Sequence, residues 1–233
     1  MRRVLLKISG ERLAARGVSV HDAEVIGMLA RGIKRVHEMG IQVCLVIGGG
    51  NIYRGSSGIP NIDRATGDYM GMLATVINAL ALQGAINNLG VVSRVQSAIP
   101  MRSICEPYVR QKAISHMEKN RIVIFAAGTG NPFFTTDTAA VLRSVEMGCD
   151  VMLKGTLVDG IYSDDPRTNI NAERITKLSY TDVLSKKLRV LDSSAVSIAR
   201  DNGMPVVIFS LDSEMAFYEV INKQGNYSTI EGE

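Results

Sequence analysis

The residues best suited to chemistry lie in one loop between a short apolar run and a helical segment. Residues 127–140 read AGTGNPFFTTDTAA, and hydroxyl and carboxylate side chains stand in a row at Thr135, Thr136 and Asp137. A strand-to-helix connection needs only about two to six residues and a cap. Glycine amides, hydroxyls and a helix N-terminus at the end of a buried strand suit an anionic ligand. We interpret the loop as a binding site, and the alternative is that Thr136 or Asp137 simply caps the helix.

Two further glycine-bearing turns follow strand-like runs. Residues 7–10 (KISG) end the first run, and residues 48–51 (GGGN) end the second. The carboxyl ends of parallel strands lie together, where open α/β folds bind ligands. Glycine lets backbone N–H groups approach phosphate oxygens without a Cβ in the way. Together with the nearby cations Lys7 and Arg54, the three turns favour a ligand that carries phosphates.

Strand-like and helical segments alternate along the chain, which predicts an α/β fold with a mainly parallel sheet and helices on both faces. Strands are expected at residues 4–8, 41–47, 91–95, 121–127, 150–153 and 205–209, and helices at 19–40, 66–89, 108–119, 139–147, 194–203 and 213–222. Ser19 is expected to cap its helix with Asp22, residues 150–153 to form an edge of the sheet, and Asp159-Gly160 to close a hairpin. We expect one domain, in which a mild compositional shift separates residues 1–150 from residues 151–233.

Composition excludes several classes of protein. The net charge is only +3, and no block of Lys and Arg resembles a nucleic-acid-binding arm. The apolar runs are strand-sized, so neither a membrane span nor a signal peptide is expected. Cys44, Cys105 and Cys149 lack metal-ligand spacing and are interpreted as reduced thiols of a cytoplasmic protein. The motifs of P-loop kinases and of Rossmann dehydrogenases are both absent.

Five segments carry a resemblance to a known family: residues 6–11, 46–51, 67–75, 128–137, and 158–162 with 165–166. On these segments the chain resembles the bacterial uridylate (UMP) kinases of the amino acid kinase family over nearly its whole length. The resemblance implies a three-layer αβα sandwich and the reaction ATP + UMP → ADP + UDP, with Mg²⁺ as cofactor. It also implies a cytoplasmic homohexamer that works in pyrimidine nucleotide biosynthesis, with no nucleic-acid or membrane partner.

The same resemblance implies site residues. The ATP-binding set is Lys7, Ile8, Ser9, Gly10, Gly50, Arg54, Thr156, Tyr162 and Asp165. The UMP-binding set is Gly49, Asp68, Thr129, Gly130, Asn131, Pro132, Phe133, Phe134, Thr135 and Thr136. The catalytic set is Lys7, Arg54, Asp137 and Lys154, and no protein ligand of Mg²⁺ is assigned. Asp68 is expected to accept hydrogen bonds from the ribose hydroxyls, or alternatively to serve only as a capping residue of its helix.

Other functions remain as alternatives. Within the same fold, kinases of carboxylates or of carbamate are the closest rivals, but residues 67–75 and the pair Phe133-Phe134 favour a nucleotide acceptor. A non-catalytic nucleotide-binding or storage relative would be expected to lose Lys7, Arg54 or Asp137, and all three are present.

Overall fold

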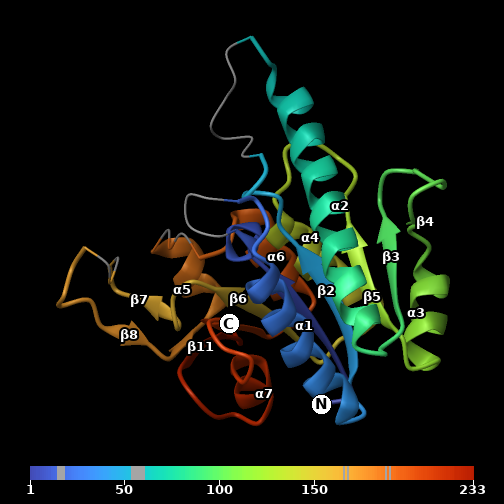
Figure 1. Cartoon of the computed structure of the whole chain (residues 1–233). Helices are drawn as coiled ribbons and strands as arrows, with labels where there is room; N and C mark the ends of the chain where they lie inside the picture. Colours follow the sequence, from blue (N-terminus) through green and yellow to red (C-terminus); the bar gives the residue numbers. More distant parts are fainter. Residues whose placement is uncertain (15–18, 54–60, 165, 167, 187, 189) are drawn as a thin grey trace.

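The structure is a computed structural model (Figure 1) that describes residues 1–14, 19–53, 61–164, 166, 168–186, 188 and 190–233. Two residues of the predicted site, Arg54 and Asp165, lie outside the described residues, so their roles stay predictions.

A nine-stranded sheet with the order β4-β3-β5-β2-β1-β6-β10-β11-β9 forms the centre of the fold. Its strands are β1 (Arg3–Ile8), β2 (Gln42–Ile47), β3 (Ser93–Ser97), β4 (Glu106–Pro107), β5 (Ile122–Ala126), β6 (Val151–Thr156), β9 (Lys177–Leu178), β10 (Val206–Ser210) and β11 (Tyr227–Ile230). Among these strands only the β10–β11 pairing is antiparallel, which confirms the mainly parallel sheet. A separate antiparallel pair joins β7 (Ile161–Tyr162) to β8 (Arg174–Ile175).

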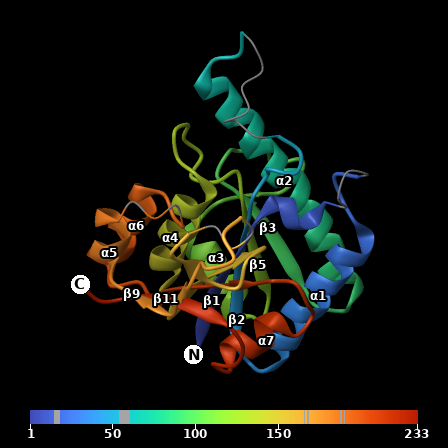
Figure 2. The ribbon, with the colours of Figure 1, turned by 90° about the vertical axis from the view of Figure 1, so that its left-hand side faces the viewer.

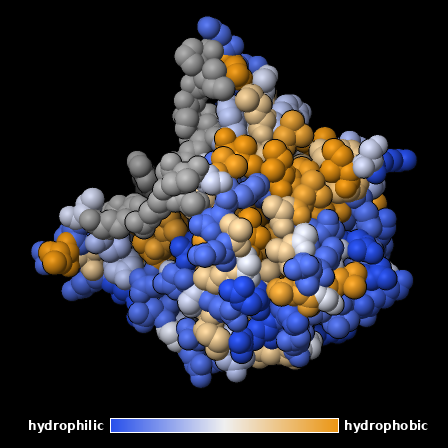
Figure 3. Space-filling view, in the orientation of Figure 1, coloured by the Kyte–Doolittle hydropathy of each residue, from blue (hydrophilic) through white to orange (hydrophobic). Residues whose placement is uncertain are grey.

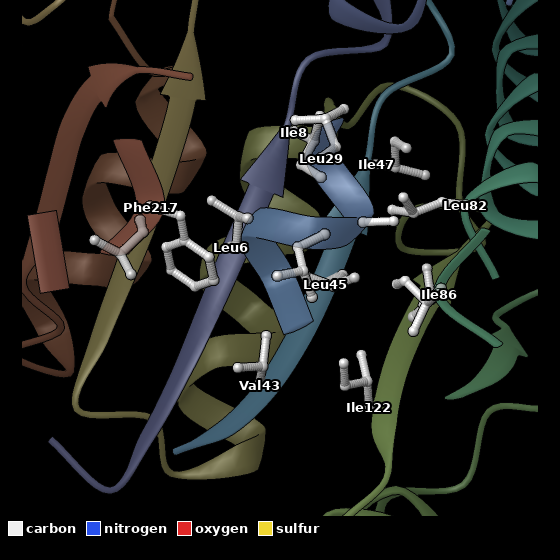
Figure 4. Close-up of a cluster of buried hydrophobic side chains, with 14 of the residues drawn as sticks. Leu6, Ile8, Leu29, Val43, Leu45, Ile47, Leu82, Ile86, Ile122 and Phe217 are labelled. Carbon is white, nitrogen blue, oxygen red and sulfur yellow. The ribbon is translucent and has the colours of Figure 1, made fainter. Parts of the chain in front are cut away.

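Helices cover both faces of the sheet, as predicted. One apolar core contains residues of α1 (Ala23–Glu38), α2 (Arg64–Asn88) and α7 (Ala216–Ile221), and the other contains residues of α3 (Arg110–Glu118), α4 (Thr136–Met147), α5 (Tyr180–Ser185) and α6 (Ser193–Asp201). Figure 2 shows α5 and α6 on one side of the sheet and α1 on the other. Successive residues of a strand point to opposite faces, so Leu6 and Ile8 enter the first core (Figure 4) while Leu5 enters the second.

Three local expectations were wrong. The first helix begins at Ala23 and its cap is Asp22, because the Asp22 side chain accepts from the amides of Glu24 and Val25. Strand β6 is not an edge, since it lies between β1 and β10. Asp159-Gly160 closes no hairpin between neighbouring strands, because β6 ends in the main sheet whereas β7 pairs with β8.

Helix α2 has the length and hydropathy of a membrane-crossing segment. Residues along it, including Ala74, Val76, Ala79, Leu82 and Ile86, are nevertheless buried in the first core. We therefore interpret α2 as a core helix. Part of its outer face remains apolar and exposed, at Tyr69, Leu73 and Ile77, and Figure 3 shows an apolar area over this helix.

Candidate active site

The strand order gathers the predicted site at one edge of the sheet. The carboxyl ends of β5, β2, β1 and β6 are successive neighbours. Lys7 of β1 is the register partner of Lys154 of β6. Both side chains point to the face covered by α4, because Leu5, two residues before Lys7, packs in that core. Asp137 in the first turn of α4 meets both lysines there.

Lys7, Asp137 and Lys154 form a buried ionic cluster. Lys7 Nζ lies 2.9 Å from Asp137 Oδ1, and Lys154 Nζ donates to Asp137 Oδ2 at 2.6 Å. The first contact is an ion pair without hydrogen-bond alignment, so Oδ1 accepts no hydrogen bond from the described residues. Lys154 Nζ also donates to the carbonyl oxygen of Val190.

The carboxylate of this cluster remains ionised. Burial raises the pKa of Asp137, but the attraction of Lys7 and Lys154 outweighs burial and holds the pKa at about 2. Burial lowers the pKa of Lys154, and the negative charge of Asp137 opposes that change. One carboxylate thus contacts two lysine side chains, so basic groups outnumber acidic groups in the cluster. A fixed cation at strand ends is suited to binding and stabilising phosphoryl oxygens.

The N-terminus of α4 is built differently from the sequence interpretation. The cap is Thr135, whose hydroxyl accepts from the amides of Asp137 at 3.1 Å and Thr138 at 3.4 Å. Thr136 and Asp137 are therefore residues of the first helical turn and not caps. Because Thr135 caps the helix, the Asp137 carboxylate is not needed as a cap and contacts Lys7 and Lys154 instead.

A cavity of about 270 Å³ opens where β2 and β5 end. Its lining comes from α2, from the turn after β2, and from the loop before α4 with the first residue of that helix. The lining residues are Gly49, Tyr53, Arg64, Gly67, Asp68, Gly71, Met72, Thr75, Gly128, Thr129, Asn131, Phe134, Thr135 and Thr136. Seven of the ten residues predicted to bind UMP are among them, including Asp68. Gly130 and Pro132 do not line it, nor does Phe133, whose side chain is 67% exposed.

Asp68 links α2 to the loop before α4. Its Oδ2 accepts from the amide of Phe133 at 2.7 Å, and Arg64 Nε lies 3.0 Å from the same carboxylate. Asp68 does not cap the helix, because that role belongs to Asp63, which accepts from the amide of Thr66. The sequence interpretation missed Arg64, although its position four residues before Asp68 on a helix was a usable signal.

A second cavity, of about 420 Å³, opens where β6 and β10 end. It is lined by Leu157, Val158, Asp159, Tyr162, Pro166, Phe209, Ser210, Asp212, Ala216, Glu219, Val220, Gln224, Gly225 and Asn226. Tyr162 donates to Asp159 Oδ1 at 2.6 Å, which anchors the ring at the wall. Thr156 does not line the cavity. Its hydroxyl donates to the Val158 carbonyl at 2.7 Å, in the turn that follows β6. Apart from Tyr162, the sequence assigned none of these residues to the ATP site, and those of β10 and α7 reach this wall only through the tertiary fold.

At two positions near these cavities the backbone of another segment lies so close that only glycine fits. A Cβ on Gly10 would lie 2.5 Å from the Gly48 carbonyl oxygen, and one on Gly49 would lie 2.7 Å from the Gly71 carbonyl oxygen. The turns after β1 and β2 therefore stack directly on each other and on α2. Ile8 is fully buried in the first core and its carbonyl accepts from the Gly48 amide, so its predicted contact with ATP stays a prediction.

Comparison with known proteins agrees with this geometry. The model of the amino acid kinase family matches residues 2–210. The uridylate kinase of Anaplasma phagocytophilum (strain HZ) is 54% identical over 230 residues, which cover 99% of this chain and 94% of that protein. The uridylate kinase of Wolbachia pipientis wMel is 56% identical over 229 residues, covering 98% and 92%.

Among solved structures, UMP kinase from Ureaplasma parvum superposes with a TM-score of 0.95 at 35% identity, covering 99% of both chains. UMP kinase from Bacillus anthracis gives a TM-score of 0.94 at 35% identity, covering 99% of this chain and 96% of that one. Both likenesses cover 99% of this chain. The chain therefore belongs to the amino acid kinase family and, within it, to the uridylate kinases.

Proposed function

We propose that the protein transfers the γ-phosphoryl group of ATP to UMP and releases ADP and UDP. The observation that carries the proposal is the buried cluster of Lys7, Asp137 and Lys154. It lies at the ends of β1 and β6, while one cavity opens at β2 and β5 and the other at β6 and β10. Two ligands placed in these cavities would direct their phosphates toward the same cations. The names of the most similar proteins support the same reaction.

The cavity beside Asp68 is the proposed UMP site. Asp68 would accept from ribose hydroxyls, and Gly49 with the loop of residues 129–136 would surround the nucleotide. Arg64 adds a cation at its wall. The loop amides and the N-terminus of α4 suit the phosphate of UMP.

The cavity beside Tyr162 is the proposed site of the adenosine of ATP. Tyr162 provides an aromatic wall, and Thr156 supports the strand end beneath it. The ATP phosphates would extend along the turns that contain Ser9, Gly10 and Gly50, with Arg54 as a predicted contact. On this assignment residues 1–150 bind mainly UMP and phosphates, whereas residues 151–233 bind mainly the ATP nucleoside.

The chemistry needs no strong base, because the phosphate of UMP is already a nucleophile. Catalysis then consists of bringing two anions together and stabilising the charge on the transferred group. Lys7 and Lys154 provide that charge, and Asp137 keeps both ammonium groups oriented. Such preorganised cations act strongly where water is excluded.

Mg²⁺ is the expected cofactor, and it would enter with ATP. The described residues contain no group of three or more His, Cys, Asp and Glu suited to hold a metal. Asp137 Oδ1, a buried oxygen without a hydrogen bond from those residues, fits a contact to the ion or its water. When bound, the metal would neutralise phosphate charge.

We also propose a cytoplasmic homohexamer acting in pyrimidine nucleotide biosynthesis. The exposed apolar side chains of Tyr69, Leu73 and Ile77 on α2 support self-association, because monomers rarely expose contiguous apolar area (Figure 3).

A coupled ADP-release assay with UMP, CMP, dTMP, glutamate and carbamate as acceptors tests the function. We expect rapid ADP release with UMP only. Turnover with glutamate or carbamate would instead support the other kinases of this fold. Nucleotide binding without ADP release from any acceptor would support a non-catalytic storage relative.

A further inference from the structure

Two polar side chains on α2 connect this helix to both substrate loops. Thr75 and Asn78 are three residues apart and share a helix face. Thr75 is 3% exposed and Asn78 is fully buried. α2 lies beside β2 and β5 in Figure 1, and both side chains contact backbone just beyond the ends of these strands. Neither residue is among the site residues that the family resemblance implies, although Thr75 lines the cavity proposed for UMP.

Thr75 holds the start of the loop before α4. Its hydroxyl donates to the Met72 carbonyl at 2.7 Å and accepts from the amide of Ala127 at 2.7 Å. Ala127 follows β5 directly and has a φ of 60°, a left-handed conformation that is costly for a residue with a Cβ. The buried Ala127 amide has its partner in Thr75. The hydrogen bond therefore stabilises the strained residue from which the proposed UMP loop departs.

Asn78 holds the loop after β2. Its Nδ2 donates to the Gly48 carbonyl at 2.7 Å and to Asn51 Oδ1 at 2.8 Å, and its Oδ1 accepts from Asn51 Nδ2 at 3.1 Å. His21 Nε2 lies 2.7 Å from the same Oδ1. The Gly48 carbonyl and the Asn51 side chain are also the atoms against which Gly10 packs. Asn78 therefore fixes the turn after β2 and, through it, the turn after β1, whose Gly50 and Gly10 are proposed to bind the ATP phosphates. Gly49, which lines the proposed UMP cavity, packs instead against Gly71 and Ala74 of α2.

We propose that Thr75 and Asn78 are positioning residues that set the two substrate loops separately, Thr75 the UMP loop and Asn78 the ATP-phosphate turns. The inference rests on the proposed function, because it uses the assignment of the loops to the two nucleotides. Each side chain bonds to one loop, and none of their described hydrogen bonds joins the two. The separation predicts that each residue influences the KM of one substrate.

Steady-state kinetics of Thr75→Val and Asn78→Leu, with ATP and UMP varied in turn, tests the proposal. Valine keeps the shape of threonine but cannot accept from Ala127, so we expect the KM for UMP to rise about tenfold and the KM for ATP to change less than twofold. Asn78→Leu should do the reverse. Asn78→Ser is a milder variant should the leucine variant fold poorly. KM does not depend on the fraction of enzyme that is folded, so partial unfolding would lower only the apparent kcat.

Two matched controls separate positioning from general stability. Ser144→Ala removes a buried helical hydroxyl whose hydrogen bond among the described residues goes to the Ala140 carbonyl of its own helix. Asn87→Leu removes an α2 side-chain amide that accepts from the Ser93 backbone amide. Ser93 begins β3 and so lies at the amino ends of the strands, away from the site at their carboxyl ends. Both controls can lower the melting temperature, but neither should change the KM for ATP or UMP.

The outcomes are distinguishable. If Thr75→Val and Asn78→Leu raise both KM values equally, or leave both unchanged, while the wild-type protein phosphorylates UMP, the inference is overturned and the proposed function stands. A wild-type protein that releases no ADP with UMP overturns the proposed function and this inference with it.

Discussion

Replacing Asp137 by Asn should nearly abolish turnover while the protein remains folded. The substitution keeps the size of the side chain but removes the charge that meets Lys7 at 2.9 Å and Lys154 at 2.6 Å. The amide can still accept one hydrogen bond, but its NH₂ group faces an ammonium group on the other side. The two lysines would then repel each other without a counter-ion.

The magnitude follows from the ionisation of Asp137. Its pKa falls from 3.8 to about 2 in spite of burial. One pKa unit corresponds to about 1.4 kcal/mol, so the lysines favour the carboxylate by roughly 2 kcal/mol after the cost of burial. Loss of that amount from the transition state alone slows a reaction roughly thirtyfold. Misplacement of the uncompensated ammonium groups adds to the loss, and we therefore expect kcat to fall on the order of a hundredfold or more.

A coupled ADP-release assay across pH supplies a second readout. The charged groups that face Lys154 are Asp137, Lys7 and Asp192. Burial lowers the pKa of Lys154, and Asp137 raises it, so the Asn variant should lose the Lys154 proton at a lower pH than the wild type. The alkaline decline of kcat should consequently begin at lower pH in the variant.

Asp150→Asn is the matched control. Asp150 is also a carboxylate with a lowered pKa, but it accepts from the amides of Arg2 and Arg3. These residues lie at the amino end of β1, away from the site at the carboxyl ends of the strands. Its loss should leave kcat near the wild-type value. If Asp137→Asn, shown by circular dichroism to be folded, turned over at the wild-type rate, Asp137 would have no place in the mechanism and the reasoning above would be refuted.

Three further predictions concern the surroundings of the cluster. Asp68→Asn should raise the KM for UMP with little effect on ATP, and an unchanged UMP value would count against a ribose contact. Gly10→Ala should lower the free energy of unfolding by roughly 1–3 kcal/mol, measured by urea denaturation, because its Cβ would lie 2.5 Å from the Gly48 carbonyl oxygen; wild-type stability would show that the turns can separate freely. Burial raises the pKa of Glu106, but hydrogen bonds from His116, Lys112 and Gln96 hold it at about 2, below its ordinary 4.5. The stability it adds is thus complete above about pH 4.5 and lost as pH falls through about 2, so Glu106→Gln should lower the melting temperature at pH 7 but not near pH 2.

Much of the fold was predictable because its signals are local. The short apolar runs of β1, β2 and β5 are typical of buried strands. Their alternation with helical segments predicts a parallel sheet. The need for glycine in the turns at residues 7–10 and 48–51 is also a local signal, since only glycine permits the close approach seen at Gly10. That these turns bind a ligand stays a prediction. The predictions failed where a choice depended on distant residues. Asp22, Asp63 and Thr135 cap helices at which other polar neighbours were equally plausible caps.

By itself, the sequence determined which side chains are available for chemistry and at which turns they stand, because turn conformation and strand burial are properties of short segments. Only the tertiary structure decided that Lys7 and Lys154 meet at one carboxylate, since that depends on the register between β1 and β6, 147 residues apart. It also decided that Thr75 and Asn78 reach two separate loops. Such contacts arise when a helix packs across strand ends, and no local pattern encodes which backbone groups it will meet.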